Sequence, residues 1–384
     1  MSNADTELQD NSQMLADSAR VYMERGYGEA VRNTSLAHPQ GCVPQRWQEF
    51  AELGWLALPI TERDGGLGGS LAEICVVTQA MGQALVNEPY LACAVLGSML
   101  LASVAPDAVR QQWLPALADG SKRIAFAPWE AGLDMDFRRI DTTAHRDATG
   151  WRLQGDKYLV PGGAGADAWI VAARVADGAE LALFLLAANG NGIHATAQVL
   201  YDGQHSVQLR LENAVAAEPL LQGPAAQVLA RLEQAMLVAT VAHCAETVGT
   251  MQRAFDITLD YLKTRKQFGK TIASNQVVQH RLVDLHVEIA EARALTASTA
   301  AQLASLQLEG DSSAARRQVG ATRACIVRTA RHVWEESVQL HGAIGMTDEY
   351  QVGRYVKRLA LACTLFGALE EQLEELAALA LDRQ

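Results

Sequence analysis

The chain has 384 residues, 49% of them apolar, with a formal net charge of −12 at pH 7 and a pI near 5.3. This composition is typical of a globular protein of about two or three domains, and the acidic balance excludes DNA as the main partner, because phosphate binding depends on clustered Lys and Arg. No apolar stretch reaches the roughly 20 residues of a membrane span, and the polar, acidic first 13 residues resemble no secretory signal or transit peptide. We therefore expect a cytoplasmic protein without a membrane helix.

The cysteines give no indication of a metal centre. They lie far apart, without CxxC or histidine-rich spacing, so we expect neither a zinc site nor a disulfide framework. Each is interpreted as a small buried apolar residue: Cys42, Cys75, Cys93, Cys244, Cys325 and Cys363. A small anionic ligand such as a coenzyme A ester or a dinucleotide is compatible with the chain, since one or two placed arginines are enough to bind a pyrophosphate.

The first third of the chain, residues 14–121, shows helical periodicity. Apolar residues recur at helical spacing in two runs, Trp47–Leu53 and Ile74–Met81. Between them lies the glycine-rich stretch 59–70, which matches neither the dinucleotide nor the Walker phosphate-loop pattern. We interpret it as a tight turn that ends in a Ser70 helix cap, and expect an N-terminal helical domain over residues 1–122.

The central part of the chain has the pattern of a β domain. Apolar segments of strand length, bounded by Gly, Asn and Asp, lie at residues 169–173, 181–185 and 207–211. They predict a β-barrel or sandwich over residues 123–222. The pair Gly223-Pro224 then breaks the chain before a long helical region.

The last part of the chain, residues 223–384, has four long helical patterns, which predict a four-helix bundle. The patterns run from Leu237 to Leu262, from Val278 to Ile289, from about Ser312 to Leu340 and from Leu359 to Leu376. The expected fold is therefore α+β and mostly α, in the order helical domain, β domain, helical bundle. Strands and helices do not alternate, so a Rossmann fold is not expected.

Two short motifs in the bundle have the chemistry of a dinucleotide site. The first is R-K-Q-F-G-K-T-I at residues 265–272, and the second is Q-L-H-G-A-I-G-M-T-D-E at residues 339–349. Arg265 offers a planar fork of donors suited to a pyrophosphate, Phe268 a flat apolar surface, and Gln339 an amide that donates and accepts. Together they suit an adenosine diphosphate group. The alternative is a surface ion pair for Arg265 and core packing for Phe268.

These motifs and the order of elements resemble the acyl-CoA dehydrogenase family. The family has an R-x-x-F-G motif with a trailing Q and a Q-x-x-G-G-x-G-x-x-x-E motif, and the stretches 52–55, 59–70 and 76–82 resemble its N-terminal domain. The resemblance implies the acyl-CoA dehydrogenase fold and an FAD shared at a subunit interface. The residues that it assigns to the adenosine end of an FAD held mainly by the neighbouring subunit are Arg265, Gln267, Phe268, Gln276, Gln339 and Gly342.

The position of the family's catalytic base is occupied by a residue that cannot titrate. In the family a glutamate removes the α proton of the acyl-CoA while the flavin N5 accepts the β hydride. Its usual place is a Y-E-G motif 27 residues after the motif glutamine, which here is Phe366. A second family position, on the first bundle helix, falls at Ala239-Thr240 and has no carboxylate either.

The expected flavin cradle in the β domain also departs from the family. The family's T-E-P-x-A-G-S-D loop corresponds to residues 127–134, which contain no threonine, and its W-I-T-N-G motif corresponds to residues 159–163. Pro161 supplies neither a hydroxyl nor a backbone N–H, and Leu159 cannot supply the stacking face of tryptophan. We therefore expect that this chain does not hold a complete flavin site alone.

The resemblance thus implies an acyl-CoA dehydrogenase subunit without a base, active in α,β-desaturation only as part of a complex. It resembles the base-lacking subunit of the heteromeric acyl-CoA dehydrogenases of bacterial steroid catabolism. The implied partners are an acyl-CoA substrate, a paralogous subunit in an α2β2 heterotetramer, and an electron-transfer flavoprotein as acceptor. Neither nucleic acid nor a membrane is expected as a partner.

Two other functions are compatible with the sequence. In the first, the chain is an autonomous dehydrogenase with a relocated base at Glu246 or Glu130. In the second, it is a non-redox protein that binds a coenzyme A ester, with His243 or His280 as acid or base. Glu246 lies two helical turns after Ala239, a displacement of roughly 10 Å, so a structural ion pair is the simpler interpretation of Glu246.

Overall fold

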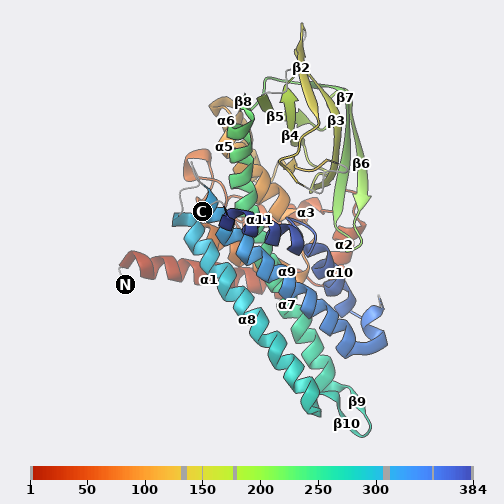
Figure 1. Cartoon of the computed structure of the whole chain (residues 1–384). Coiled ribbons are helices and arrows are strands. Elements are labelled where there is room, and N and C mark those ends of the chain that lie inside the picture. Colours follow the sequence, from red (N-terminus) through yellow and green to blue (C-terminus); the bar gives the residue numbers. More distant parts are fainter. Residues whose placement is uncertain are drawn as a thin grey trace. The chain divides into compact units, whose positions relative to one another are not determined.

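The computed structural model describes residues 3–130, 136–148, 150–175, 180–305, 312–347 and 350–381. The chain forms two compact units that interleave along the sequence (Figure 1). One unit comprises Met1–Gly28, Leu71–Val86 and Thr240–Gln384, and the other comprises Glu29–Ser70 and Asn87–Ala239. The division into three consecutive domains at residues 122 and 222 stays a prediction.

The first unit is all helix within the described residues, apart from one short hairpin. Its core is lined by buried apolar side chains of four successive helical segments, such as Val248, Leu285, Ile326 and Leu359, as the helical stripes predict. The helices are α1 (Asn3–Gly26), α4 (Leu71–Ala84), α7 (Ala225–Thr264, in this unit from Thr240), α8 (Gln276–Ser305), α9 (Ser313–His341), α10 (Val352–Ala362) and α11 (Leu369–Leu381).

The fourth helix of the expected bundle is in fact two helices. The apolar stripe from Leu359 to Leu376 predicts one continuous helix, whereas the structure ends α10 at Ala362 and begins α11 at Leu369. In the turn between them Phe366 and Gly367 have left-handed backbones, with φ of 58° and 94°. A right-handed helix cannot pass through two such residues, so the turn redirects the chain at Phe366, the position that the sequence resemblance assigns to the base.

Helix α4 crosses α7 at a distance that only glycine permits. A Cβ on Gly82 would lie 1.9 Å from the carbonyl oxygen of Glu246, and a Cβ on Gly249 would lie 1.9 Å from that of Gln79. The Thr250 hydroxyl completes this crossing by donating to the Gly82 carbonyl at 3.2 Å. The crossing therefore fixes the stretch of α7 that carries Glu246.

The second unit combines short helices with a sheet. Trp47 and Phe50 are buried on α3. Residues 59–70 form a turn, as the sequence predicts: they contain a short 3-10 helix, η1, which is followed by Gly65 at φ 87°. Helix α4 then begins at Leu71. The helices are α2 (Glu29–Ala37), α3 (Pro44–Glu52), η1 (Glu62–Asp64), the π-helix η2 (Tyr90–Gly97), α5 (Ser98–Val104) and α6 (Asp107–Ala118).

The eight strands that the structure describes in the second unit form one sheet, and strands lie at the three central segments where the pattern predicts a β domain. Its order is β6-β7-β3-β2-β4-β5-β8, with β1 paired to β4 in parallel. Alternate residues of β7, such as Val207, Leu209 and Leu211, are buried. The strands are β1 (Ile124–Ala127), β2 (Thr143–Asp147), β3 (Gly150–Pro161), β4 (Ala168–Val175), β5 (Glu180–Ala187), β6 (Ile193–Val199), β7 (His205–Ala216) and β8 (Leu221–Pro224).

Among the described residues one helix, α7, is long and apolar enough to cross a membrane by length and composition alone. Of its most apolar 18-residue window, 67% is buried inside the structure, as in the core helix of a globular protein. In the described part of the chain the six cysteines are free; four are buried, as expected, whereas Cys325 and Cys363 are only half-buried. No group of His, Cys, Asp and Glu among the described residues has metal-site geometry.

Candidate functional site

The first motif forms a hairpin that projects from the end of α7. Strand β9 (Lys266–Gln267) pairs with β10 (Lys270–Thr271), and the two-residue turn between them is Phe268-Gly269. Both turn residues have positive φ, 51° and 81°, which is the backbone of a type I′ hairpin. Phe268 is 99% exposed, so the expected alternative of core packing for this ring is not what the structure has. A positive φ, as at Phe268, is uncommon for a bulky residue.

The second motif lies at the same end of the helical unit as the hairpin. The ring of Tyr261 stacks on that of His341 with centroids 4.5 Å apart, and Tyr350 packs 5.2 Å from His341. Tyr261 is one turn before Arg265, whose backbone N–H donates to the Tyr261 carbonyl at 2.8 Å. The aromatic contact therefore joins the C-terminal end of α7 to that of α9, where Gln339 lies.

The residues assigned to the adenosine end of the cofactor are all solvent-exposed: Arg265, Gln267, Phe268, Gln276, Gln339 and Gly342. Gln276 begins α8, and Gly342 follows α9 with φ of 67° and open space where a Cβ would stand. A guanidinium, three amides, a bare aromatic face and an approachable backbone suit a pyrophosphate joined to an adenosine. The donor chemistry therefore fits the adenosine end of FAD. Asp348 and Glu349 of the second motif lie outside the described residues.

Phe366, at the position that the family resemblance assigns to the base, packs against a buried histidine. The ring of Phe366 lies 5.0 Å from that of His243 on α7, centroid to centroid. Burial lowers the pKa of His243 well below its usual value, and the positive charges of Arg323 and Arg358 lower it further. In the described part of the chain the Nδ1 atom of His243 has no hydrogen-bond partner. No carboxylate takes part in this ring contact.

The turn that carries Phe366 is held by a buried arginine on α9. The Arg323 guanidinium is fully buried and donates to the carbonyls of Ala362 at 2.6 Å, of Gly367 at 3.2 Å, and of Leu365. These carbonyls lie at and just after the C-terminal end of α10, where the helix dipole favours a positive charge. The role of Arg323 was not predicted from the sequence. Its position on the same helical face as Val319, Ile326 and Ala330 does indicate a buried arginine.

Glu246, the candidate for a relocated base, lies in an ion pair. Its carboxylate accepts from the Arg358 guanidinium at 3.0 Å, and the two side chains are only 16% and 5% exposed. Arg358 also donates to the Val86 carbonyl at 3.3 Å. The pair gives Glu246 a role as counter-ion, as the simpler interpretation has it, and a catalytic role for Glu246 stays a prediction.

In the β domain the stretch aligned with the flavin loop is held by a buried ion pair. Glu130 accepts from the ammonium of Lys157 on β3, from the Thr142 hydroxyl at 2.7 Å and from the Asp141 N–H at 2.7 Å. Burial alone would raise the pKa of Glu130, but the charge and hydrogen bond of Lys157, with the hydrogen bonds from Thr142 and Asp141, outweigh burial, so the pKa is lowered. Residues 131–134 of the expected loop lie outside the described residues.

Glu130, the second candidate for a relocated base, is one member of this ion pair. The Lys157 side chain is 0% exposed, and the neighbouring Tyr158 N–H donates to the Trp129 carbonyl at 2.9 Å, which ties the loop to β3. Leu159 follows in a bulge with φ of 51°. Lys157 was missed in the sequence, although it shares the inward parity of the buried Trp151 and Leu153 on β3.

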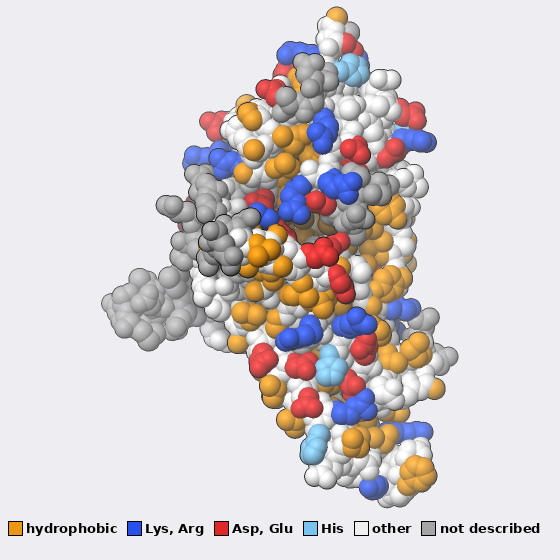
Figure 2. Space-filling view, in the orientation of Figure 1, with side chains coloured by type: hydrophobic (Ala, Val, Ile, Leu, Met, Phe, Trp, Pro, Cys, Tyr) orange, Lys and Arg blue, Asp and Glu red, His pale blue; other side chains and the backbone are white. Residues whose placement is uncertain are grey.

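A row of seven exposed residues, the last five of them small or apolar, follows one face of α8. Their spacing alternates between three and four residues, which is the seam of a helix that packs against another helix. The row consists of Gln276, His280, Val283, Val287, Ala290, Ala294 and Ala297. Over the helical unit the surface shown in Figure 2 mixes apolar, charged and histidine side chains.

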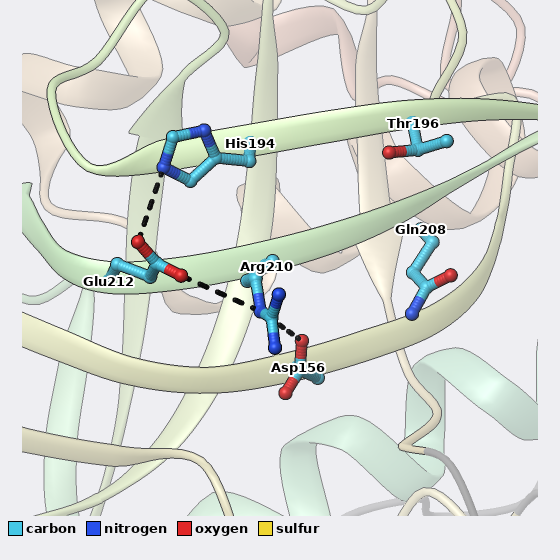
Figure 3. Close-up of a pocket in the computed structure, with 6 residues that line it drawn as sticks. All are labelled: Asp156, His194, Thr196, Gln208, Arg210 and Glu212. Carbon is cyan, nitrogen blue, oxygen red and sulfur yellow. Dashed lines mark ion pairs between the residues drawn. The ribbon is translucent and has the colours of Figure 1, made fainter.

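A separate polar pocket of about 630 Å³ lies on the outer face of β3, β6 and β7 (Figure 3). Arg210 lies 3.6 Å from both Asp156 and Glu212, and His194 lies 3.6 Å from Glu212. These four side chains are 49–66% exposed, and the arginine lies between the two carboxylates. The pocket offers no flat apolar face, so it does not suit a flavin ring.

Comparison with known proteins identifies the class to which this fold and site belong. The acyl-CoA dehydrogenase N-terminal domain model matches residues 9–121, and the acyl-CoA dehydrogenase C-terminal domain model matches residues 229–381. The chain therefore belongs to the acyl-CoA dehydrogenase family, a family of FAD-dependent oxidoreductases.

Particular members of the family resemble the chain over almost its whole length. Acyl-CoA dehydrogenase IpdE2 of Mycobacterium tuberculosis strain H37Rv is 29% identical, covering 95% of each chain. The solved Tcur3481-Tcur3483 steroid ACAD has a TM-score of 0.85 at 26% identity, covering 98% of this chain and 99% of that one. The ChsE4-ChsE5 complex from Mycobacterium tuberculosis has a TM-score of 0.86 at 23% identity, covering 97% of each, and shows the same fold.

Proposed function

We propose that the chain is the base-lacking subunit of an FAD-dependent acyl-CoA dehydrogenase complex that oxidises an acyl-CoA thioester to its α,β-unsaturated form. In this proposal it completes an FAD site whose larger part belongs to a paralogous subunit. One contrast carries the proposal: Phe268 is 99% exposed at the tip of a hairpin, whereas Phe366, which cannot titrate, occupies the position of the base.

The chain's own residues bind and orient in this proposal, and none of them takes the substrate proton. FAD, when bound, accepts the β hydride of the acyl-CoA. The Arg265 guanidinium would donate paired hydrogen bonds to the pyrophosphate, the amides of Gln267, Gln276 and Gln339 would bind polar groups of the adenosine end, and Phe268 would cover an apolar surface. The partner subunit supplies the carboxylate that removes the α proton.

The proposed partner is a paralogous subunit in an α2β2 heterotetramer. The exposed row on α8 supports this proposal, because a seam with alternating spacing of three and four, including Val283 at 59% and Val287 at 49% exposure, suits a helix of another subunit. The similarity to the Tcur3481-Tcur3483 steroid ACAD supports a second chain of the same family and a steroid-derived acyl-CoA. We further propose an electron-transfer flavoprotein as acceptor and a cytoplasmic location.

Replacing Arg265 by alanine in the complex is expected to weaken FAD binding about 10- to 100-fold. Hydrogen bonds to a charged group contribute roughly 1.5–3 kcal/mol, and each 1.4 kcal/mol corresponds to about a tenfold change in affinity. The measurement is the dissociation constant of FAD, from flavin fluorescence during titration of the apo complex. Arg253→Ala, which removes an exposed arginine from α7, is the matched control and should leave the constant within about twofold. Equal constants for both variants would reject the hairpin as part of the FAD site.

A further inference from the structure

The pairing of the hairpin decides which side chains share a face. Gln267 on β9 stands opposite Lys270 on β10, and Lys266 stands opposite Thr271. Residues directly opposite each other in an antiparallel pair point to the same side of the ribbon, and successive residues point to opposite sides. Gln267 and Lys270 therefore share one face, while Lys266 and Thr271 share the other.

Arg265 belongs to the face of Gln267 and Lys270. The pairing continues past the two strands, because the Ile272 N–H donates to the Arg265 carbonyl at 3.0 Å. Arg265 is also two residues before Gln267, so the alternation returns it to the same side. Two positive charges, Arg265 and Lys270, thus flank an amide on one face, and a third, Lys266, points away from them.

We propose that Lys270 is a further cofactor-binding residue, which binds the pyrophosphate of the FAD together with Arg265. The inference rests on the proposed function, because it concerns the same interfacial site. Lys270 is fully available for such a contact: it is exposed, and in the part of the chain that the structure describes no ion pair joins it to a carboxylate. A pyrophosphate carries more negative charge than a single guanidinium neutralises, so a second cation on the same face is chemically suited to it.

Lys266 provides a matched control within the same hairpin. It has the same charge, the same side chain and similar exposure, and it lies in the same two-stranded element, but on the opposite face. General attraction between a basic hairpin and an anionic cofactor would be weakened equally by loss of either lysine. A direct contact would be weakened only by loss of Lys270.

The test compares Lys266→Ala, Lys270→Ala and Arg265→Ala in the complex with the partner subunit, with the dissociation constant of FAD measured at two salt concentrations. Lys270→Ala is expected to weaken binding about three- to tenfold and to reduce its salt dependence, whereas Lys266→Ala changes the constant by less than about twofold. Lys270→Arg should retain most of the affinity.

Each alternative result has its own meaning. Equal effects of Lys270→Ala and Lys266→Ala, together with a large effect of Arg265→Ala, would overturn the assignment of Lys270 and leave the shared FAD site standing. No effect from any of the three variants would overturn the shared site and this inference with it. Thermal unfolding of each variant, expected to match that of the parent complex without FAD, shows that the hairpin remains folded.

Discussion

Replacing Lys157 by methionine is expected to lower the free energy of unfolding by about 3–5 kcal/mol, since removal of one member of a buried ion pair leaves the other charge without compensation. The Lys157 side chain is 0% exposed and Glu130 only 6%, so water cannot solvate the carboxylate that remains. The measurement is urea denaturation followed by tryptophan fluorescence. Six of the seven tryptophans lie in the same unit as this ion pair, so the signal reports mainly on that unit.

The acid dependence of the same variant gives an independent check. Because the pKa of Glu130 is lowered in the folded chain, its stabilising contribution is present above the pKa of an unfolded glutamate, about 4.3, and is lost as the pH falls through the lowered folded value. Lys157→Met should lose stability at pH 7 and show a weaker dependence on acid below about pH 4. Arg146→Met, an exposed cation of the neighbouring strand β2, is the control. A loss from Lys157→Met as small as that of Arg146→Met would show that the pair does not anchor the loop.

Replacing Arg323 by methionine should destabilise the helical unit by about 3–5 kcal/mol. The guanidinium donates to three carbonyls at and just after the end of α10, and methionine leaves those oxygens without this donor. The measurement is urea denaturation followed by far-UV circular dichroism, because the helices of this unit dominate that signal. The turn with Phe366 should also become accessible, visible as faster hydrogen exchange of the amides at residues 364–368.

The matched control for Arg323 is on the same helix. Arg331 is 64% exposed and pairs with Glu335 one turn away, so Arg331→Met should cost less than about 1 kcal/mol. If both variants lost the same stability, or if exchange in the turn were unchanged by Arg323→Met, then the turn would be held by packing and not by the guanidinium.

The fold was predictable because its signals are local. The stripes of α7, α8 and α9 and the alternation of β7 each follow from neighbouring residues, and the structure has a helix or strand at each of these places. The hairpin motif is local as well: Phe268-Gly269 lies between two short strands, and its neighbours Arg265 and Gln276 lie at the ends of the flanking helices.

The break between α10 and α11 was not predictable from periodicity. The spacing of Leu359, Ala362, Phe366 and Leu369 continues through it, and only Gly367 marks the turn. What stabilises the turn is Arg323, which is 44 residues away from Gly367 in the sequence and close to it only in the folded chain. Local patterns contain no information about such a partner.

The buried ion pair between Glu130 and Lys157 was not predictable from local sequence either. Glu130 and Lys157 are 27 residues apart, and neither position looks unusual alone: a glutamate in a loop and a lysine in a strand are both ordinary surface residues. In the sequence Glu130 is a candidate for a relocated base because it is a carboxylate in the β-domain loop. The structure shows the carboxylate engaged by an ammonium, a hydroxyl and backbone N–H groups instead.

Flavin stoichiometry tests the shared site most directly. The chain is purified alone and together with the proposed paralogous subunit, and the flavin absorbance and its bleaching by acyl-CoA are recorded for each preparation. The account predicts little flavin in the lone chain, one FAD per pair of chains, and bleaching that is lost when the partner's glutamate is replaced but kept in the Glu246→Gln variant of this chain. Full flavin occupancy of the lone chain, bleached by acyl-CoA without any partner, would contradict it.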